Sequence, residues 1–194
     1  MPCGSCGGGK PSGRNARQRQ TSNLVPETNI ATSTSITSAD PSEWGPLVWR
    51  LLHLLATKVG RSNNHMICME QDNLLYALVQ RIASVLPCSQ CQGHSNSYIS
   101  ANPIPTPSFM NASHYSGIIQ TWLFTFHNAV RQRLGQPITV ATIQECNALY
   151  SVPFDPELIK KFEPYVVYGI SQSLITEADW SRWLSLYNTL LSKI

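Results

Sequence analysis

Leu86-Pro87-Cys88-Ser89-Gln90-Cys91-Gln92-Gly93-His94 is the stretch of sequence from which the organisation of the chain can be worked out. Pro87 ends an apolar helical pattern, because proline disfavours the helical conformation in the residue before it. A new helix is expected to begin at the cysteines, which lie within one turn of each other. Two cysteines at this spacing can close a small disulfide, and the positive end of the helix dipole favours a thiolate. The stretch therefore predicts a redox-active pair, Cys88 and Cys91.

The segments on both sides carry helical patterns. Apolar residues at helical spacing predict helices over residues 69–86 and 113–134. Capping residues and prolines predict further helices over residues 40–58 and 88–102, and a shorter helix is expected over 139–150. Asp40 is an N-cap candidate for the first helix, and Gly135 is a C-cap candidate after the fourth. No segment shows the sustained alternation of polar and apolar residues that is typical of strands. The predicted fold class is all-α: a small helical bundle, with a four-helix core plus a short fifth helix.

The composition divides the chain into three parts. Residues 1–40 hold hardly any large apolar side chains and are expected to form a flexible tail. Residues 41–150 form the bundle domain. Residues 151–194 are expected to form a helical C-terminal extension, because helix-start signals recur at Asp155 and Thr176. The aromatic face of its last helix predicts packing on the bundle, or alternatively contact with a second copy or a partner.

Charge and hydropathy exclude several classes of function. Charged residues make up 13% of the chain, and the net charge of +3 is too small to indicate nucleic-acid binding. No apolar run approaches the ~18 residues needed to cross a bilayer, so no membrane span is expected. Residues 1–30 lack the apolar core of a secretory signal, and Pro2 and Pro11 oppose the amphipathic helix of a mitochondrial presequence. We therefore expect a protein that is not secreted.

The six cysteines comprise two Cys-x-x-Cys pairs and two single residues: Cys3 with Cys6, Cys88 with Cys91, Cys68, and Cys146. This is not the dense spacing of a small secreted disulfide scaffold. Cys88, Cys91 and His94 also have the chemistry of three zinc ligands, so the residues alone leave both redox and zinc chemistry open. Haem attachment is disfavoured, because Gln92 rather than histidine follows Cys91.

Aromatic and polar residues in two other blocks favour an aromatic cofactor. Trp49 and His53 are four residues apart in the first helix, and Trp122, Phe126 and His127 lie close together in the fourth. A bundle core can hold such a cofactor where flat side chains cover its rings and a few polar groups fix their edges. Each of these residues alone is more often part of the core, so it is the joint pattern that predicts the site.

Together, the three blocks resemble the Erv/ALR family of FAD-linked sulfhydryl oxidases over residues 42–137. The family's WxxLH, Pro-Cys-x-x-Cys and HNxVNxxL elements are matched by Trp49-Val-Arg-Leu52-His53, Pro87-Cys88-Ser-Gln-Cys91 and His127-Asn128-Ala-Val130-Arg131-Gln-Arg-Leu134. The resemblance implies a helical bundle that binds FAD beside the cysteine pair. The residues that it assigns to the flavin are Gly45, Trp49, His53, Trp122, His127, Asn128, Val130, Arg131 and Leu134.

The chain departs from the family pattern in three places. Arg131 stands where the family has asparagine, and Gln136 where it usually has lysine. A structural disulfide of the cellular members has no counterpart, since Cys146 lacks a partner cysteine in residues 108–121. The pattern is more similar to family members from large cytoplasmic DNA viruses, which implies a viral enzyme in the host cytoplasm or the virion rather than the mitochondrial intermembrane space. Cys68 and Cys146 are then expected to be buried free thiols, the alternative being a bridge between them.

The resemblance implies a homodimeric enzyme that oxidises protein dithiol substrates, with FAD as cofactor and oxygen as electron acceptor, giving hydrogen peroxide. Cys88 is expected to exchange with substrate thiols and Cys91 to face the flavin, while His94 is a candidate for moving protons. Cys3 and Cys6 are shuttle candidates, because a flexible tail of roughly 30 residues spans about 30 Å. The alternative for that tail pair is an incidental glycine-rich terminus or an adventitious metal site.

Two functions from other classes stay open on the residues alone. One is a zinc-stabilised helical interaction module that uses Cys88, Cys91 and His94 as ligands. The other is a flavin-free thiol–disulfide carrier, which exchanges disulfides without consuming oxygen. The aromatic blocks favour the oxidase over both.

Overall fold

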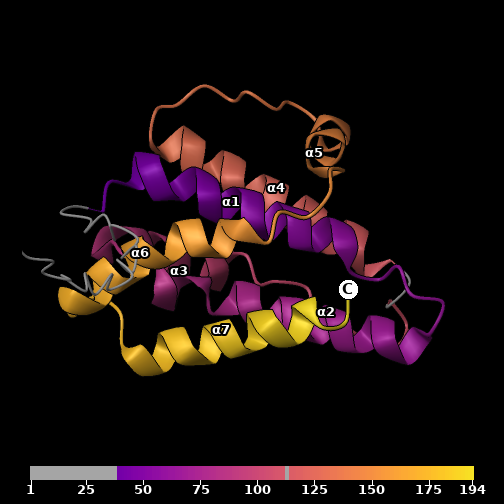
Figure 1. Ribbon diagram of the computed structural model, residues 1–194. Helices are drawn as coiled ribbons and strands as arrows, with labels where there is room; N and C mark the ends of the chain where they lie inside the picture. The colour runs from indigo at the N-terminus through magenta and orange to yellow at the C-terminus, as the bar shows by residue number, and fades with distance from the viewer. Residues whose placement is uncertain (1–38, 112–113) are drawn as a thin grey trace, which may run out of the picture. The chain divides into compact units, whose positions relative to one another are not determined.

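The computed structural model describes residues 39–111 and 114–194 (Figure 1). In these ranges it contains seven α-helices, one 3₁₀ helix and no strand. The elements are α1 (Pro41–Lys58), α2 (His65–Gln80), η1 (Ile82–Val85), α3 (Ser89–Ala101), α4 (Tyr115–Arg133), α5 (Ile143–Tyr150), α6 (Glu157–Ser171) and α7 (Glu177–Leu191). The all-α class is confirmed. The predicted tail, with Cys3 and Cys6, lies outside the described residues except for Ala39 and Asp40.

Helix α1 is the central element of the bundle. The Asp40 side chain caps it by accepting a hydrogen bond from the Ser42 backbone N–H at 2.8 Å. Pro46 lies inside the helix, so the regular structure begins before this proline and not after it. Every residue from Leu51 to Thr57 is buried, because α1 packs against α4, α5, α6 and α2. Figure 1 shows it between α4 and α6.

The predicted helix over residues 69–86 was wrong at both ends. Helix α2 begins at His65, because the Asn64 side chain caps it by accepting from the Met66 backbone N–H. It ends at Gln80, and the chain then tightens into the 3₁₀ helix η1 before Pro87. The predicted helix over 139–150 also begins later, at Ile143, where Thr142 and Glu145 form a reciprocal capping box.

Residues 151–194 pack on the bundle through α6 and α7. Helix α6 lies against α1, and α7 lies against α2 and η1. The Trp183 indole of α7 is fully buried and donates a hydrogen bond to the Leu78 carbonyl at 3.1 Å. The aromatic face of α7 is therefore part of the same hydrophobic core as α1. Within the described ranges, none of the helices has the length and apolar content that a bilayer crossing requires.

Candidate functional site

The cysteine pair begins helix α3. Cys88 is the N-cap residue, and its sulfur accepts a hydrogen bond from the Cys91 backbone N–H at 3.1 Å. Cys88 and Cys91 form a disulfide with a Cα–Cα distance of 5.2 Å. Both are half-buried against the core, whereas Pro87 before them is buried. The structure therefore places a disulfide at a helix N-terminus, where the dipole stabilises a thiolate once the bond opens.

An aromatic cluster joins α1, α3 and α4. The Trp49 indole stacks on the His127 ring, with centroids 4.2 Å apart and planes within 4°. Phe126 contacts Trp49 edge-on at 5.1 Å and stacks on Tyr98 of α3 at 4.4 Å. Trp122 packs on Phe126 at 5.2 Å, and its Nε1 donates to the Asn102 carbonyl at 3.0 Å. The tryptophans and histidine that sequence reasoning assigned to a cofactor thus lie in one cluster.

His53 is the polar centre of this cluster. Its side chain is 2% exposed, and its Nδ1 lies 3.7 Å from the sulfur of Cys146. Its Nε2 is buried without a hydrogen-bond partner among the described residues. Burial, with a smaller contribution from His127, lowers the pKa of His53 to about 3. At neutral pH it is therefore an uncharged imidazole with one unsatisfied ring nitrogen, which fits a polar cofactor edge.

His127 is also uncharged at neutral pH. Burial, with a smaller contribution from Arg131, lowers the pKa of His127 to about 4. His127, Asn128 and Arg131 line one side of a small cavity of about 20 Å³, and Cys146 and Tyr150 of α5 line the other. The Arg131 Nε donates to the Pro137 carbonyl at 2.9 Å, which fixes this guanidinium at the end of α4.

The remaining predicted flavin residues lie outside these ring contacts. Gly45 is half-buried one turn before Trp49, and an added Cβ there would meet no atom within 4 Å. Val130 packs on the core, whereas Leu134 is 50% exposed just beyond α4. The structure thus groups Trp49, His53 and His127 but gives Gly45 and Leu134 no part in the cluster.

Sequence reasoning missed two tyrosines. Tyr150 stacks on His53 with centroids 4.5 Å apart and planes within 7°, and Tyr98 stacks on Phe126. Tyr98 lies seven residues after Cys91, two turns along the same helix face, a spacing that was available in the sequence. Tyr150 is the last residue of α5, the helix that begins at the Thr142 capping box. That capping motif was therefore the sequence signal from which the position of Tyr150 at the end of a short helix could have been predicted.

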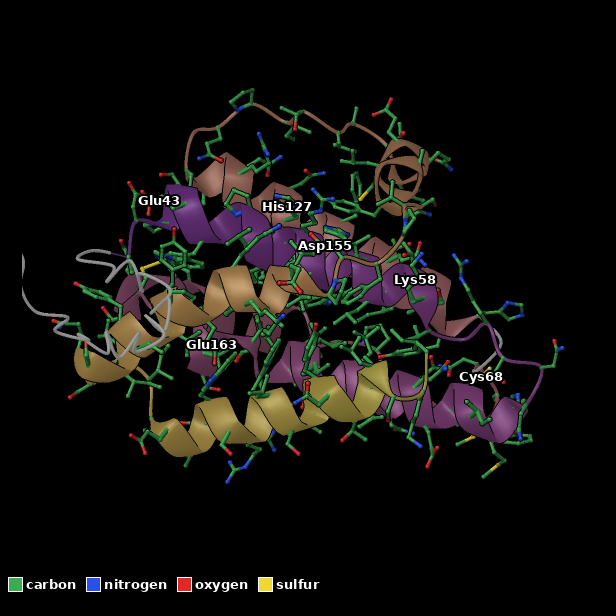
Figure 2. The ribbon with its side chains drawn as sticks, viewed as in Figure 1. Glu43, Lys58, Cys68, His127, Asp155 and Glu163 are labelled. Atoms are coloured by element: carbon green, nitrogen blue, oxygen red, sulfur yellow. A yellow bond between two sulfur atoms is a disulfide. The ribbon has the colours of Figure 1, made fainter. Side chains whose placement is uncertain are left out.

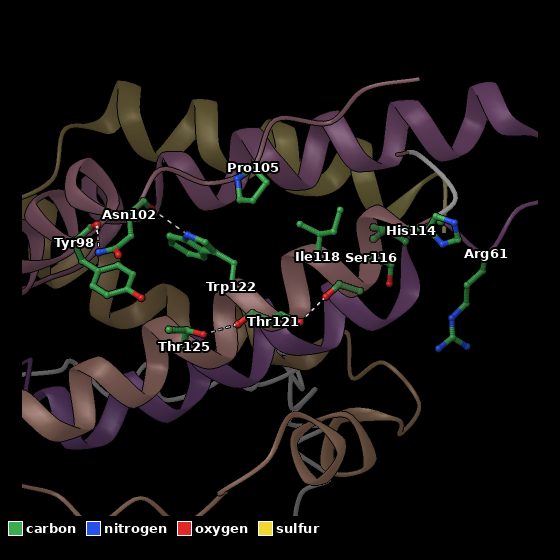
Figure 3. Close-up of a pocket in the computed structure, with 13 residues that line it drawn as sticks. Arg61, Tyr98, Asn102, Pro105, His114, Ser116, Ile118, Thr121, Trp122 and Thr125 are labelled. Atoms are coloured by element: carbon green, nitrogen blue, oxygen red, sulfur yellow. Dashed lines mark hydrogen bonds between the residues drawn. The ribbon is translucent and has the colours of Figure 1, made fainter. Parts of the chain in front are cut away.

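An open groove of about 930 Å³ lies beside the cluster, between the end of α3 and the first half of α4. Figure 3 shows Tyr98 and Trp122 toward one end and Arg61 and His114 toward the other. The sequence did not predict this groove. It adjoins the aromatic cluster because Tyr98 and Trp122 belong to both.

The structure also shows where the two single cysteines lie and whether side chains gather that could bind zinc. Cys68 and Cys146 are buried free thiols, as expected, and Figure 2 shows Cys68 well away from His127. No group of three or more metal-ligating side chains gathers in the described part of the chain. The Nδ1 of His94 is buried without a partner there, and the sulfurs of Cys88 and Cys91 are bonded to each other. The geometry thus gives the zinc module no support.

Comparisons with known proteins agree with this geometry. The family model described as Erv1 / Alr matches residues 46–150. A protein of African swine fever virus named FAD-linked sulfhydryl oxidase is 35% identical over 95 residues, covering 49% of this chain and 71% of that protein. A putative FAD-linked sulfhydryl oxidase, 347L, of Invertebrate iridescent virus 6 is 29% identical over 103 residues, covering 53% and 89%. Another, 096R of Invertebrate iridescent virus 3, is 30% identical over 151 residues, covering 76% and 85%. No solved structure matches.

Proposed function

Because the chain belongs to the Erv1/Alr family, we propose that it is an FAD-dependent thiol oxidase that forms disulfides in protein substrates and passes the electrons to oxygen. The observation that carries the proposal is the combination of a disulfide at the start of α3 with an aromatic cluster holding an unsatisfied, uncharged histidine. Both lie within the residues that the family model matches. The family and its viral relatives support FAD as the cofactor.

The residues of the cluster fit this cofactor. Trp49 and His127 present flat rings, and the buried Nε2 of His53 lacks a partner that a flavin edge would supply. Asn128 adds amide hydrogen-bonding groups beside them, and Arg131 adds the positive charge that a diphosphate requires. When bound, FAD accepts the two electrons of a dithiol and delivers them to oxygen, giving hydrogen peroxide.

The cysteine pair performs the thiol chemistry. A substrate thiolate attacks Cys88, which forms a mixed disulfide and releases Cys91 as a thiolate. A second substrate thiolate then attacks the substrate sulfur of that mixed disulfide, which closes the substrate disulfide and releases Cys88. Two electrons have then moved from the substrate to Cys88 and Cys91. We assign the outer role to Cys88 because it is the N-cap, where the helix terminus stabilises its thiolate.

We also propose that the enzyme is a homodimer that acts in the host cytoplasm or the virion. The viral relatives support the location, since the matched proteins come from African swine fever virus and two iridescent viruses. The family resemblance supports the dimer. Sedimentation of the purified protein tests it, and a single species with the mass of one chain would contradict it.

The visible absorption spectrum and oxygen uptake of the purified protein test the oxidase. We expect flavin bands that bleach when a dithiol is added without air and return as oxygen is consumed. Cys91→Ser is expected to keep the bands and lose the bleaching, whereas Cys68→Ser, far from the cluster, leaves both unchanged. A colourless protein that takes up no FAD would overturn the proposal. Disulfide exchange without oxygen uptake would instead identify the flavin-free carrier.

A further inference from the structure

We infer that the turn between α6 and α7 holds the redox cysteine pair in the geometry that favours its disulfide. This turn, residues 169–175, is called the α6–α7 corner below. It lies beyond residues 46–150, the part of the chain that the family model matches. Its contacts reach both ends of the short segment that contains Cys88 and Cys91.

Gln92 supplies the polar link between the corner and the cysteine pair. Its Nε2 donates to the Leu86 carbonyl at 2.9 Å and to the Leu174 carbonyl at 2.8 Å. A carboxamide nitrogen has two hydrogens, so these two bonds use its whole donor capacity. Leu86 precedes Cys88 and Gln92 follows Cys91, so the first hydrogen bond joins the two ends of the segment that contains the pair. We call this closed segment, residues 86–92, the bracket. The second hydrogen bond connects the bracket to the corner.

Gly169 supplies the apolar link. A Cβ added there would lie 2.7 Å from the Ile175 Cδ1 and 3.2 Å from the Pro87 Cβ. Helix α6 therefore packs closely on Pro87 at Gly169, and a larger residue there would require Ile175 and Pro87 to shift. The Leu174 and Ile175 backbone N–H groups both donate to the Gly169 carbonyl, at 2.9 and 3.3 Å, so the corner folds tightly over this contact.

These contacts act on the thiol–disulfide equilibrium. Reduction by glutathione consumes two thiols and one protein disulfide, and gives one glutathione disulfide and one protein dithiol, with two electrons transferred. A disulfide closes only over a narrow range of Cβ separations. A bracket that fixes the backbone from Leu86 to Gln92 keeps the two reduced sulfurs near that range, which raises their effective concentration. The bracket therefore shifts the equilibrium toward the disulfide.

The test is the glutathione redox equilibrium of Gln92→Met, measured on the full chain without FAD. Methionine has a similar length but no donor, and the Cys91 N–H bond to Cys88 remains, so the contribution of the helix terminus is retained. We expect the equilibrium to move about tenfold toward the dithiol, or ~30 mV. The matched control is Gln172→Met, because Gln172 is exposed and its side chain donates only to the Ser171 Oγ at 3.4 Å. An equilibrium equal in Gln92→Met and the control overturns the inference.

A second variant reaches the same contact from the other side and leaves the Gln92 side chain unchanged. Gly169→Ala adds a Cβ 2.7 Å from the Ile175 Cδ1 and 3.2 Å from the Pro87 Cβ, so the packing between the corner and Pro87 must adjust. We expect this change also to shift the equilibrium toward the dithiol. Gly117→Ala, where an added Cβ meets nothing within 4 Å, is its control. A merely structural role would lower the melting temperature without moving the glutathione equilibrium, and that result would also overturn the inference.

The inference rests on the proposed function only for the role of Cys88 and Cys91 as the pair that accepts substrate electrons. Because the glutathione equilibrium is measured without FAD, it tests whether the bracket favours the disulfide even if the protein proves to bind no flavin. Failure of the oxidase proposal and failure of this inference are therefore separate results.

Discussion

Asp72 of α2 is fully buried, and neither of its carboxylate oxygens has a hydrogen-bond partner among the described residues. Burial raises the pKa of Asp72 to about 7. Tyr115 of α4 lies near this carboxyl, but its hydroxyl donates to the Pro105 carbonyl instead. A charged Asp72 is therefore unsatisfied in the folded protein, whereas an unfolded chain exposes it to water.

We expect Asp72→Asn to stabilise the protein at pH 8. The folded state holds the Asp72 proton up to about pH 7, whereas the unfolded state loses it near pH 4, so the contribution of Asp72 to stability falls between these values. An uncharged amide avoids that loss, which predicts a gain of about 1–3 kcal/mol at pH 8 and a smaller difference at pH 4. Urea denaturation at both pH values measures it. Equal gains at both would contradict the role of ionisation.

Buried histidines act on stability in the opposite direction. The pKa of His53 is about 3 in the folded protein, so the unfolded state takes up protons first as the pH falls below about 6.5. Stability from His53 is therefore present above that pH and is lost toward pH 3. Comparing Asp72→Asn with the parent at each pH cancels this term, because both proteins retain His53.

We expect Cys146 to set which nitrogen of His53 carries the hydrogen, because its sulfur is the hydrogen-bond partner of Nδ1. Burial raises the pKa of the Cys146 thiol, so the thiol keeps its hydrogen, and its sulfur lies 3.7 Å from the Nδ1 of His53. We expect the S–H to donate to Nδ1, which would leave the ring hydrogen on the unpartnered Nε2. We expect Cys146→Val to weaken FAD binding about tenfold, close to one hydrogen bond, and Cys146→Ser to stay within about threefold because serine keeps a donor. Fluorescence titration of the apoprotein with FAD measures both. Equal dissociation constants for the valine and serine variants would contradict the argument.

At the scale of the elements, helix ends were predicted correctly where a capping residue was recognised in the sequence. Asp40 caps α1 as expected, and Gly135 follows α4 with a φ of 64°, the left-handed conformation that suits glycine. The start of α2 was misplaced because Asn64 was not read as a cap. Its end was misplaced because apolar residues at helical spacing do not separate an α-helix from the 3₁₀ turn of η1.

The candidate site was predictable only in part, for a physical reason. The cysteine pair and the Trp49, His53 and His127 positions follow from local spacing and resemblance. The contacts from Cys146 and Gln92 depend on how distant helices meet. His53 and Cys146 are 93 residues apart, and Gln92 and Leu174 are 82 apart. No short window of sequence contains both members of either pair.

At the scale of the whole molecule, the hydrophobic core continues across the boundary predicted between residues 150 and 151, where the bundle domain was expected to end and the C-terminal extension to begin. The described residues, 39–111 and 114–194, belong to one compact unit. Phe162 of α6 packs on Trp44 of α1 with ring centroids 6.4 Å apart. The Trp183 indole of α7 donates a hydrogen bond to the Leu78 carbonyl of α2. The family model thus matches residues 46–150, whereas the hydrophobic core also includes residues of α6 and α7.

The tail pair gives the last prediction. Cys3 and Cys6 precede the described residues in the sequence, and a random coil of the length between Cys6 and Ala39 would span about 30 Å, which is why we propose this pair as a shuttle to Cys88. We expect replacing both tail cysteines by serine to slow oxidation of a reduced protein substrate several-fold. Oxidation of dithiothreitol should be unchanged, because a small dithiol reaches Cys88 directly. Oxygen uptake with each substrate separates the two cases, and Cys68→Ser is the control. Equal rates for the variant and the parent on the protein substrate would remove the shuttle, and electrons would then enter at Cys88 directly.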